Sequence, residues 1–156
     1  MKHFLMAASA LMLSAGLPAT AQSFNESQQV TAITVSQLQA MVTSLGHTIR
    51  SVDGTTVHAE GSGLRYSVRG TACDDAGACN GVNMAVTYNR DADDTAEDIN
   101  RANVRYAAVS LWYDEDSIGI SRYLVLDGGM TLGNVKFNTQ LLLNIAPAAI
   151  NVVNEQ

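Results

Sequence analysis

Basic residues, cysteine and histidine are all scarce in this chain, and the scarcity excludes several functions. The 156 residues carry 9 Lys and Arg against 15 Asp and Glu, a formal net charge of −6. Such a field repels phosphate backbones and anionic lipid surfaces, so we expect neither nucleic acid nor a membrane as a partner. The 2 cysteines alone make a poor zinc site, which needs four ligands.

Long apolar runs are also absent except at the N-terminus. Lys2 is followed by apolar residues from Phe4 to Leu17, and Ala19 and Ala21 form the A-x-A arrangement that precedes signal-peptidase cleavage. We therefore expect a secretory signal peptide over residues 1–21, cleavage after Ala21 and a periplasmic protein. The run is shorter than the roughly 20 residues that span a bilayer. An uncleaved N-terminal anchor is the alternative.

Removal of the signal leaves enough chain for one domain. The remaining 135 residues carry 8 Lys and Arg against 15 Asp and Glu, a net charge of −7. A chain of this length can bury a proper core. We expect a flexible leader over residues 22–33 and a single domain over residues 34–153, with no membrane insertion after cleavage.

The first periodic segment predicts a short helix that ends at Gly46. Thr34 and Gln37 have the spacing of a capping box, and Ile33 stands at the position of a hydrophobic staple. Apolar residues then follow the i, i+3, i+4, i+7 spacing of one helix face: Leu38, Met41, Val42 and Leu45.

From Thr48 the apolar period changes to two, which predicts strands. Residues 48–52 and 55–60 flank Asp53-Gly54, a pair typical of type I′ hairpin turns, whose central residues both have positive φ. Alternating patterns follow over residues 64–70 and 82–88. Four strands linked by tight turns predict an antiparallel meander with one solvated face.

A second helix, a second hairpin and a third helix follow. Asp94 is the expected N-cap of a helix to about Val104. Residues 107–113 and 118–126 predict the hairpin, and Thr131 can cap the last helix, which Pro147 should disturb. The order α-ββββ-α-ββ-α indicates an α+β fold, a mostly antiparallel sheet with helices packed on one face.

Several motifs together resemble the YbjN-domain family, described as bacterial sensory transduction regulators with a fold similar to type III secretion chaperones. The resemblance rests on Asn100 and Asn103, spaced N-x-x-N, on the acidic turn at residues 114–116, and on the Gly-Gly-apolar-Thr sequence at residues 128–131. It covers residues 34–146. It implies a small non-enzymatic interaction module with an undefined protein partner, and a possible homodimer.

The sequence departs from the family pattern in two places. Family members often place an arginine before the acidic turn, where this chain has residues 107–109, Ala-Ala-Val. Many relatives also lack an export signal, so a cytoplasmic role does not carry over.

Aromatic and asparagine side chains are the candidates for an interaction surface. Trp112 and Tyr113 point to opposite faces of one strand, so one of them can be exposed for a protein contact. Core packing is the alternative for both. The polar candidates are Asn100, Asn103, Asn134 and Asn138, which could instead be hydrogen-bonding partners at helix ends.

Residues for catalysis or metal binding are few. His47 and His58 could meet on neighbouring strands and bind a transition metal, but no H-x-x-x-H or Cys/His cluster supports a site. The acidic segment at residues 91–97 lacks the glycine and glutamate of an EF-hand loop. No G-x-S-x-G, Walker or dinucleotide motif occurs, so we expect no enzyme, no metal and no cofactor.

Cys73 and Cys79 are expected to form a disulfide. Cysteines of an exported chain meet an oxidising compartment and usually pair. Their five intervening residues do not make the C-x-x-C redox motif. The pair also suits family members, which often have cysteines before this strand.

Three functions remain. The first is an exported YbjN-like interaction or regulatory module of the bacterial envelope. The alternatives are a periplasmic small-ligand or metal-binding protein that uses His47 and His58, and a small hydrolase or isomerase with a cleft of paired titratable groups.

Overall fold

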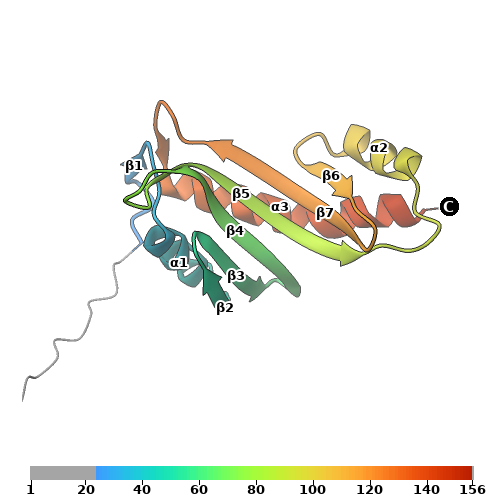
Figure 1. Cartoon of the computed structure of the whole chain (residues 1–156), viewed down its shortest axis with the longest axis horizontal. Helices are drawn as coiled ribbons and strands as arrows, with labels where there is room; N and C mark the ends of the chain where they lie inside the picture. The colour runs from blue at the N-terminus through green and yellow to red at the C-terminus, as the bar shows by residue number, and fades with distance from the viewer. Residues whose placement is uncertain (1–23, 156) are drawn as a thin grey trace, which may run out of the picture.

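The computed structural model describes residues 24–155 and shows a mixed α+β fold (Figure 1). The signal peptide expected over residues 1–21 lies outside the described residues. The helices are α1 (Val35–Ser44), α2 (Ala96–Arg105) and α3 (Leu132–Asn154). The strands are β1 (Gln29–Val30), β2 (Thr48–Asp53), β3 (Thr56–Gly61), β4 (Leu64–Cys73), β5 (Cys79–Asn89), β6 (Ser110–Tyr113), β7 (Ser117–Val125) and β8 (Met130–Thr131).

Six of these strands form one antiparallel sheet in the order β2-β3-β4-β5-β7-β6. The side chains that alternate toward one face are apolar: Val68 pairs with Met84, and Val86 pairs with Ile120. Helix α1 packs against β2, β3 and β4, and α3 packs against β5 and β7. In Figure 1 the sheet faces the viewer and α3 runs behind it, so the predicted arrangement of helices on one face is confirmed.

The predicted cap of α1 is present. Thr34 Oγ1 accepts a hydrogen bond from the Gln37 backbone N–H at 3.3 Å, and Gln37 Oε1 accepts one from the Thr34 N–H at 2.9 Å. Ile33 and Leu38, the predicted staple, are both fully buried. These contacts fix the direction in which the chain enters the core.

The type I′ turn lies at a different hairpin from the one predicted. Asp53 still belongs to β2, so Gly54 and Thr55 are the central turn residues, and only Gly54 has a positive φ, +53°. The next turn has positive φ at both central residues, +54° at Ser62 and +76° at Gly63, as a type I′ turn requires. The prediction placed the first turn one residue early.

Thr95, rather than the predicted Asp94, caps α2. Thr95 Oγ1 accepts a hydrogen bond from the Asp98 N–H, and the Asp98 carboxylate accepts one from the Thr95 N–H at 3.0 Å. The Thr95 hydroxyl, as the main donor, lowers the pKa of Asp98. Asp94 is instead buried in the turn before the helix, where its carboxylate accepts a hydrogen bond from the Asp91 N–H at 2.7 Å.

Helix α3 continues through Pro147 to Asn154, contrary to the predicted disturbance. Pro147 lies on the exposed side of the helix, and the helix loses only the one hydrogen bond that residue 147 would otherwise donate to the carbonyl of Leu143. The predicted cap is present, because Thr131 Oγ1 accepts a hydrogen bond from the Asn134 N–H at 3.2 Å. No helix within residues 24–155 is both long and apolar enough to cross a bilayer.

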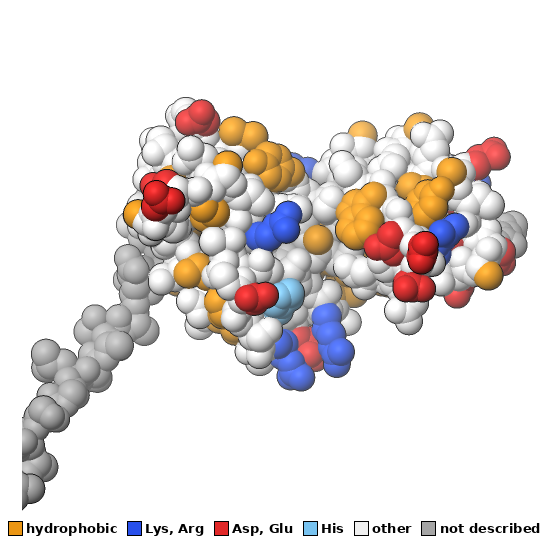
Figure 2. Space-filling view, in the orientation of Figure 1, with side chains coloured by type: hydrophobic (Ala, Val, Ile, Leu, Met, Phe, Trp, Pro, Cys, Tyr) orange, Lys and Arg blue, Asp and Glu red, His pale blue; other side chains and the backbone are white. Residues whose placement is uncertain are grey.

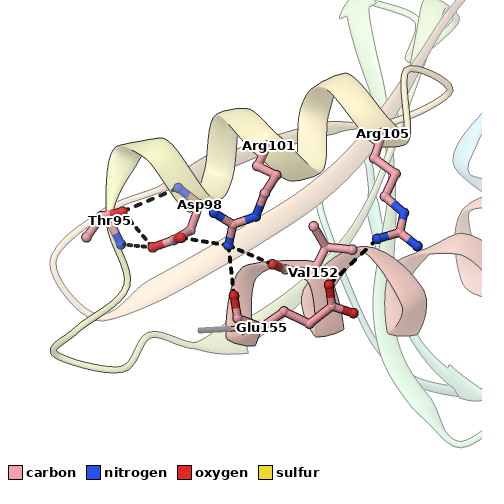
Figure 3. Close-up of polar contacts among 6 residues, drawn as sticks. All are labelled: Thr95, Asp98, Arg101, Arg105, Val152 and Glu155. Carbon is pink, nitrogen blue, oxygen red and sulfur yellow. Dashed lines mark hydrogen bonds and ion pairs between the residues drawn. The ribbon is translucent and has the colours of Figure 1, made fainter.

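Two arginines of α2 hold the C-terminal end of α3 (Figure 3). Arg101 donates to the carbonyl oxygens of Val152 and Glu155, at 3.1 Å each, and to the Asp98 carboxylate of its own helix at 2.7 Å. Arg105 lies 3.6 Å from the Glu155 carboxylate. The last carbonyls of a helix lack intrahelical partners and carry partial negative charge, so these cations anchor α2 on α3.

The packed part of the chain begins before the boundary predicted at Thr34. Strand β1 pairs with β8, and Ile33 exchanges two backbone hydrogen bonds with Cys79, both 2.9 Å long. Glu26 accepts a bond from Lys136 Nζ at 2.6 Å. The part of the expected flexible leader from residue 24 onward therefore lies against the domain.

The predicted disulfide between Cys73 and Cys79 is present at the end of the β4–β5 hairpin. The two residues are directly opposite partners in the sheet. Asp74 also organises the loop, because its Oδ1 accepts hydrogen bonds from the N–H groups of Ala76 at 3.0 Å and Ala78 at 2.9 Å.

We expect reduction of this disulfide to destabilise the protein by roughly 2 to 3 kcal/mol, because opening a loop this short restores that much chain entropy to the unfolded state. Urea unfolding with and without reductant measures the change. A double variant, Cys73→Ala with Cys79→Ala, is the control and should not respond to reductant. Identical curves for the wild-type protein under both conditions would show that the loop contacts alone hold the hairpin.

Candidate functional site

The face of the six-stranded sheet that α1 and α3 do not cover is solvated, and we call it the open sheet face. Figure 2 shows it with basic side chains gathered over the β2–β4 side and apolar ones over the β6–β7 side. Its residues alternate with the buried ones along the strands. They are His58 and Glu60 of β3, Arg65, Ser67 and Arg69 of β4, Asn83, Ala85 and Thr87 of β5, Gly119, Ser121 and Tyr123 of β7, and Trp112 of β6.

Small side chains hollow the middle of the open sheet face. Ser67, Ala85 and Thr87 lie on adjacent strands and form part of a shallow cavity of ≈ 380 Å³, which we call the sheet hollow. His58 and Arg65 also line it. A volume of this size is in the range of small-molecule and peptide side-chain sites.

Arginines gather around the sheet hollow in an otherwise acidic chain. Arg50 and Arg65 both lie 3.7 Å from the carboxylate of Glu60. Arg69 lies on the same face, opposite Thr56 and Asn83. Two carboxylates share this end of the face, Glu60 and Asp53, which lies opposite Thr56. Three arginines against these two leave it with a local charge of about +1, although the chain carries a net charge of −6.

Two exposed aromatic residues occupy the other side of the face. Trp112 is 44% exposed and Tyr123 is 54% exposed. Each ring lies over a glycine of the neighbouring strand, Trp112 over Gly119 and Tyr123 over Gly81, where a Cβ would collide with it. The Tyr123 hydroxyl also accepts a hydrogen bond from Thr71 at 3.2 Å. The rings are therefore held in place while one side stays open to solvent.

Trp112 and Tyr113 point to opposite faces of β6, as the alternation predicted. Trp112 is on the open sheet face. Tyr113 lies on the other side, with the Arg90 guanidinium stacked 4.4 Å from its ring centre. Tyr123 was missed by the sequence reasoning. Tyr123 is opposite Asn83, and its ring reaches Gly81 two positions along the neighbouring strand, a contact that the sequence alone does not show.

The side chain of Asn103 is not available to a partner protein, because it hydrogen-bonds the backbone at the free edge of β6. Its Oδ1 accepts a hydrogen bond from the Leu111 N–H at 2.7 Å, and its Nδ2 donates to the Leu111 carbonyl at 3.1 Å. The side-chain amide thus takes the place of a neighbouring strand. Asn100, three residues earlier on α2, is exposed.

Asn134 and Asn138 belong to a polar link between α3 and β7. Asn138 is 5% exposed, and its Oδ1 accepts a hydrogen bond from Arg122 Nε at 2.6 Å. Its Nδ2 donates to Asn134 Oδ1 at 2.6 Å. Arg122 also donates to the Ala108 carbonyl. Of the six predicted surface residues, only Trp112 therefore lies on the open sheet face, and the six do not form one surface.

His47 and His58 lie in different places and do not form a common site. His58 lines the sheet hollow, whereas His47 lines a separate cavity beside α3. Within residues 24–155, no three His, Cys, Asp or Glu side chains come together closely enough to hold a metal ion.

His47 instead joins Ser62 and Tyr66 in a chain of hydrogen bonds that sequence reasoning missed. Its Nδ1 lies 2.9 Å from the Tyr66 hydroxyl, and its Nε2 lies 3.4 Å from Ser62 Oγ. Burial lowers the pKa of His47 and raises the pKa of Tyr66 to about 12.

This arrangement has the order of a nucleophile, a base and an orienting group, but its geometry is loose. The Nε2–Ser62 Oγ separation of 3.4 Å is longer than the roughly 2.6 to 3.2 Å over which a general base takes a proton. The protonated Tyr66 hydroxyl can donate to Nδ1 or accept from it, because a phenol does both.

Comparisons with known proteins identify relatives of low sequence identity. The family model YbjN, described as “Putative bacterial sensory transduction regulator”, matches residues 34–155. The crystal structure of YbjN from E. coli, “a putative transcription regulator”, is similar with a TM-score of 0.58 and 13% identity, over 78% of this chain and 95% of that one. The HopA1-SchA chaperone-effector complex gives a TM-score of 0.47 and 14% identity, over 67% of this chain and 82% of that one. The search of curated proteins found no match.

We expect Asn103→Ala to destabilise the protein by about 1 to 3 kcal/mol, because it leaves the N–H and carbonyl of Leu111 without their partner. Asn100→Ala on the exposed side of the same helix is the matched control and should change stability by less than about 0.5 kcal/mol. Urea unfolding measures both. Equal effects of the two substitutions would mean that Asn103 does not protect the edge of β6.

Proposed function

This chain belongs to the YbjN family, whose model matches residues 34–155, and we propose that it is an exported, non-enzymatic protein-interaction or regulatory module of the bacterial envelope. The open sheet face is the surface that binds the partner. The observation that carries the proposal is the pair of exposed aromatic rings, Trp112 and Tyr123, held beside a hollow lined by small side chains and arginines.

Rigid exposed aromatics are the residues from which protein interfaces draw most of their binding energy. Trp112 and Tyr123 lie over glycines, so little rotamer freedom remains to be lost when a partner covers them. The two rings stand on strands of a well-packed sheet rather than on loops. A partner that docks here therefore meets a preformed surface.

The chemistry of the face favours an acidic segment that also carries apolar side chains. Arg50, Arg65 and Arg69 attract carboxylates, and the apolar rings accept an aliphatic or aromatic side chain. The short side chains of the sheet hollow let a polypeptide backbone approach the strands closely. An extended peptide segment combines these features.

A non-enzymatic role is supported by the loose geometry of the nucleophile-like arrangement within residues 24–155. His47 Nε2 lies 3.4 Å from Ser62 Oγ, longer than the roughly 2.6 to 3.2 Å over which a general base takes a proton. Export is supported by the basic start, apolar run and A-x-A pattern of residues 1–21. The Cys73–Cys79 disulfide also suits an oxidising compartment.

A small acidic ligand is the second candidate occupant of the same face. The sheet hollow has a volume of ≈ 380 Å³, with Arg50, Arg65 and His58 in its lining. A carboxylate could pair with the arginines in place of Glu60. Such a ligand would not need the two exposed aromatic residues, which distinguishes it from a peptide.

Photo-crosslinking in living cells tests the proposal. A photoreactive phenylalanine analogue at position 112 or 123 should give a discrete adduct with a partner protein, identified by mass spectrometry. The same analogue at Val104, which is 76% exposed on α2, is the control and should give no such adduct. Arg65→Glu should reduce the adduct at least about tenfold, because it repels an acidic segment.

Two results would contradict the proposal. Adducts that form equally at position 104 would mean that the contacts are random collisions. A complete absence of adducts at positions 112 and 123 in all growth conditions would mean that no protein covers the open sheet face, and a bound small acid that is lost with Arg65→Glu would then favour the second candidate.

A further inference from the structure

A second cavity lies beside α3, on the side of the sheet that the helices cover. Its volume is ≈ 230 Å³, and we call it the α3 hollow. This is the volume of roughly eight water molecules in the liquid, so one small ring with its substituents fits. Helix α3 and the chain next to β2 and β3 supply the lining, which consists of His47, Ser62, Phe137, Gln140, Leu141, Leu143 and Asn144.

The lining of the α3 hollow is polar but uncharged. None of its side chains, all of them within residues 24–155, is an Asp, Glu, Lys or Arg. Burial lowers the pKa of His47, so its ring is neutral at pH 7. Lys136, the one charged residue of α3, is paired with the Glu26 carboxylate at 2.6 Å. A charged ligand would lose its hydration here without meeting an opposite charge, so the hollow favours a neutral one.

Two side-chain amides face solvent at the hollow with their hydrogen-bonding capacity unused. Gln140 and Asn144 are four residues apart, so they share one face of α3. Both are exposed, and neither side-chain amide has a partner among residues 24–155. Each carries two N–H donors and a carbonyl acceptor in one plane. Together they suit a ligand with several groups that both donate and accept.

His47 is held in place at the opposite wall. Its ring lies against Gly61, where a Cβ would collide with it. Its Nδ1 lies 2.9 Å from the hydroxyl of Tyr66, which is itself buried. Nε2 is therefore the nitrogen left for a ligand. Its 3.4 Å separation from Ser62 Oγ is at the long end of the hydrogen-bond range, so both atoms have capacity to spare.

Ser62 keeps a strained backbone at the rim of the hollow. Its φ is +54°, in the left-handed region where type I′ turns favour glycine, asparagine or aspartate. A serine there is strained, whereas a glycine is not. Strained residues persist where another requirement fixes them, and they cluster at functional sites. The requirement that this structure offers is the hydroxyl that lines the α3 hollow.

Phe137 adds a flat apolar surface to this polar site. Its ring is 60% exposed, and it lies one turn before Gln140 and Leu141 on the same face of α3. A sugar ring has the matching chemistry, since its faces present C–H groups and its rim carries hydroxyls. The C–H face of a sugar stacks on an aromatic ring, while planar amides donate to and accept from neighbouring hydroxyls.

We propose that the α3 hollow binds one neutral sugar residue. Its C–H face lies on Phe137, and its hydroxyls bond to Gln140 and Asn144 on one wall and to His47 and Ser62 on the other. A hydroxyl both donates and accepts, so either tautomer of His47 suits it. The sugar is either free or the end of a longer glycan. This site goes beyond the proposed function, which concerns the open sheet face.

Saturation-transfer NMR on the purified protein at pH 7 tests the site. The probes are the methyl glycosides of glucose, galactose, mannose and N-acetylglucosamine. At least one should bind, with the strongest transfer to the C–H protons of a single face of the ring. The uronic acid of the bound sugar has a carboxylate in place of its CH2OH group. It should bind at least about tenfold more weakly, because the carboxylate meets no cation.

Two asparagines of α3 provide a matched pair of variants. Asn144→Leu should weaken binding at least about tenfold, because it removes the amide but keeps the size of the side chain. Asn151→Leu makes the same change two turns further along the helix, where residue 151 is also exposed, and should bind like the wild type. Phe137→Leu keeps an apolar side chain without the ring and should bind more weakly than the wild type.

Ser62→Gly separates binding from folding. Glycine adopts the positive φ without strain, so the melting temperature should not fall. The loss of the hydroxyl should still weaken sugar binding several-fold, since one hydrogen bond to the ligand is lost.

A glycan array that carries the same four sugars at the ends of longer chains distinguishes the two sources. Retention on the array would show that the site reads chain ends, and binding of the methyl glycosides alone would show that it holds a free sugar. Either result supports the proposal.

Three outcomes would overturn the proposal. One is a protein that binds none of the four sugars in either form. Another is binding that Asn144→Leu and Ser62→Gly leave unchanged. The third is a uronic acid that binds as tightly as its neutral sugar. None of these affects crosslinking at positions 112 and 123, so the two proposals fail independently.

Discussion

Val68 and Met84 point to one side of two adjacent strands, and their neighbours Ser67 and Ala85 point to the other. The rest of the structure depends on this alternation. The apolar side must be covered, and α1 and α3 cover it with residues whose spacing matches a helix face. The polar side needs no cover, so it remains a solvated surface. The open sheet face is therefore a direct consequence of how the core is built.

Both edge strands of the sheet, β6 and β2, are protected against the addition of another strand. A partner is therefore expected to bind the open sheet face. On β6 the amide of Asn103 takes up the backbone groups of Leu111. On β2 the pairing with β3 is irregular between Ile49 and Ser51 and the charged Arg50 lies at that point, a combination that discourages strand addition. The open sheet face is then the surface of the sheet left for association.

Much of the fold could be predicted because its signals are local. Helix α1 was predicted from the Thr34–Gln37 spacing, and β4 and β5 from strict alternation. The family resemblance and the α+β class were also confirmed.

The two-residue strands β1 and β8 were missed, because a strand this short shows no alternation of apolar and polar residues in the sequence. They form only because distant parts of the chain pair with each other. Asn103 and Asn138 were taken for surface residues, since nothing in the sequence shows that their partners are Leu111 and Arg122. Tyr123 was missed for the same reason, as its support comes from Gly81 on another strand.

The central claim is that a protein partner covers the open sheet face in the cell. Oxidative footprinting tests it most directly, because tryptophan and tyrosine side chains are modified in proportion to their exposure to solvent. Trp112 and Tyr123 are 44% and 54% exposed in the isolated chain. The account predicts that the oxidation of both, relative to that of Tyr113, which is 41% exposed on the other side of β6, is several-fold lower in living cells than in the purified protein. Equal ratios in the two conditions would contradict it.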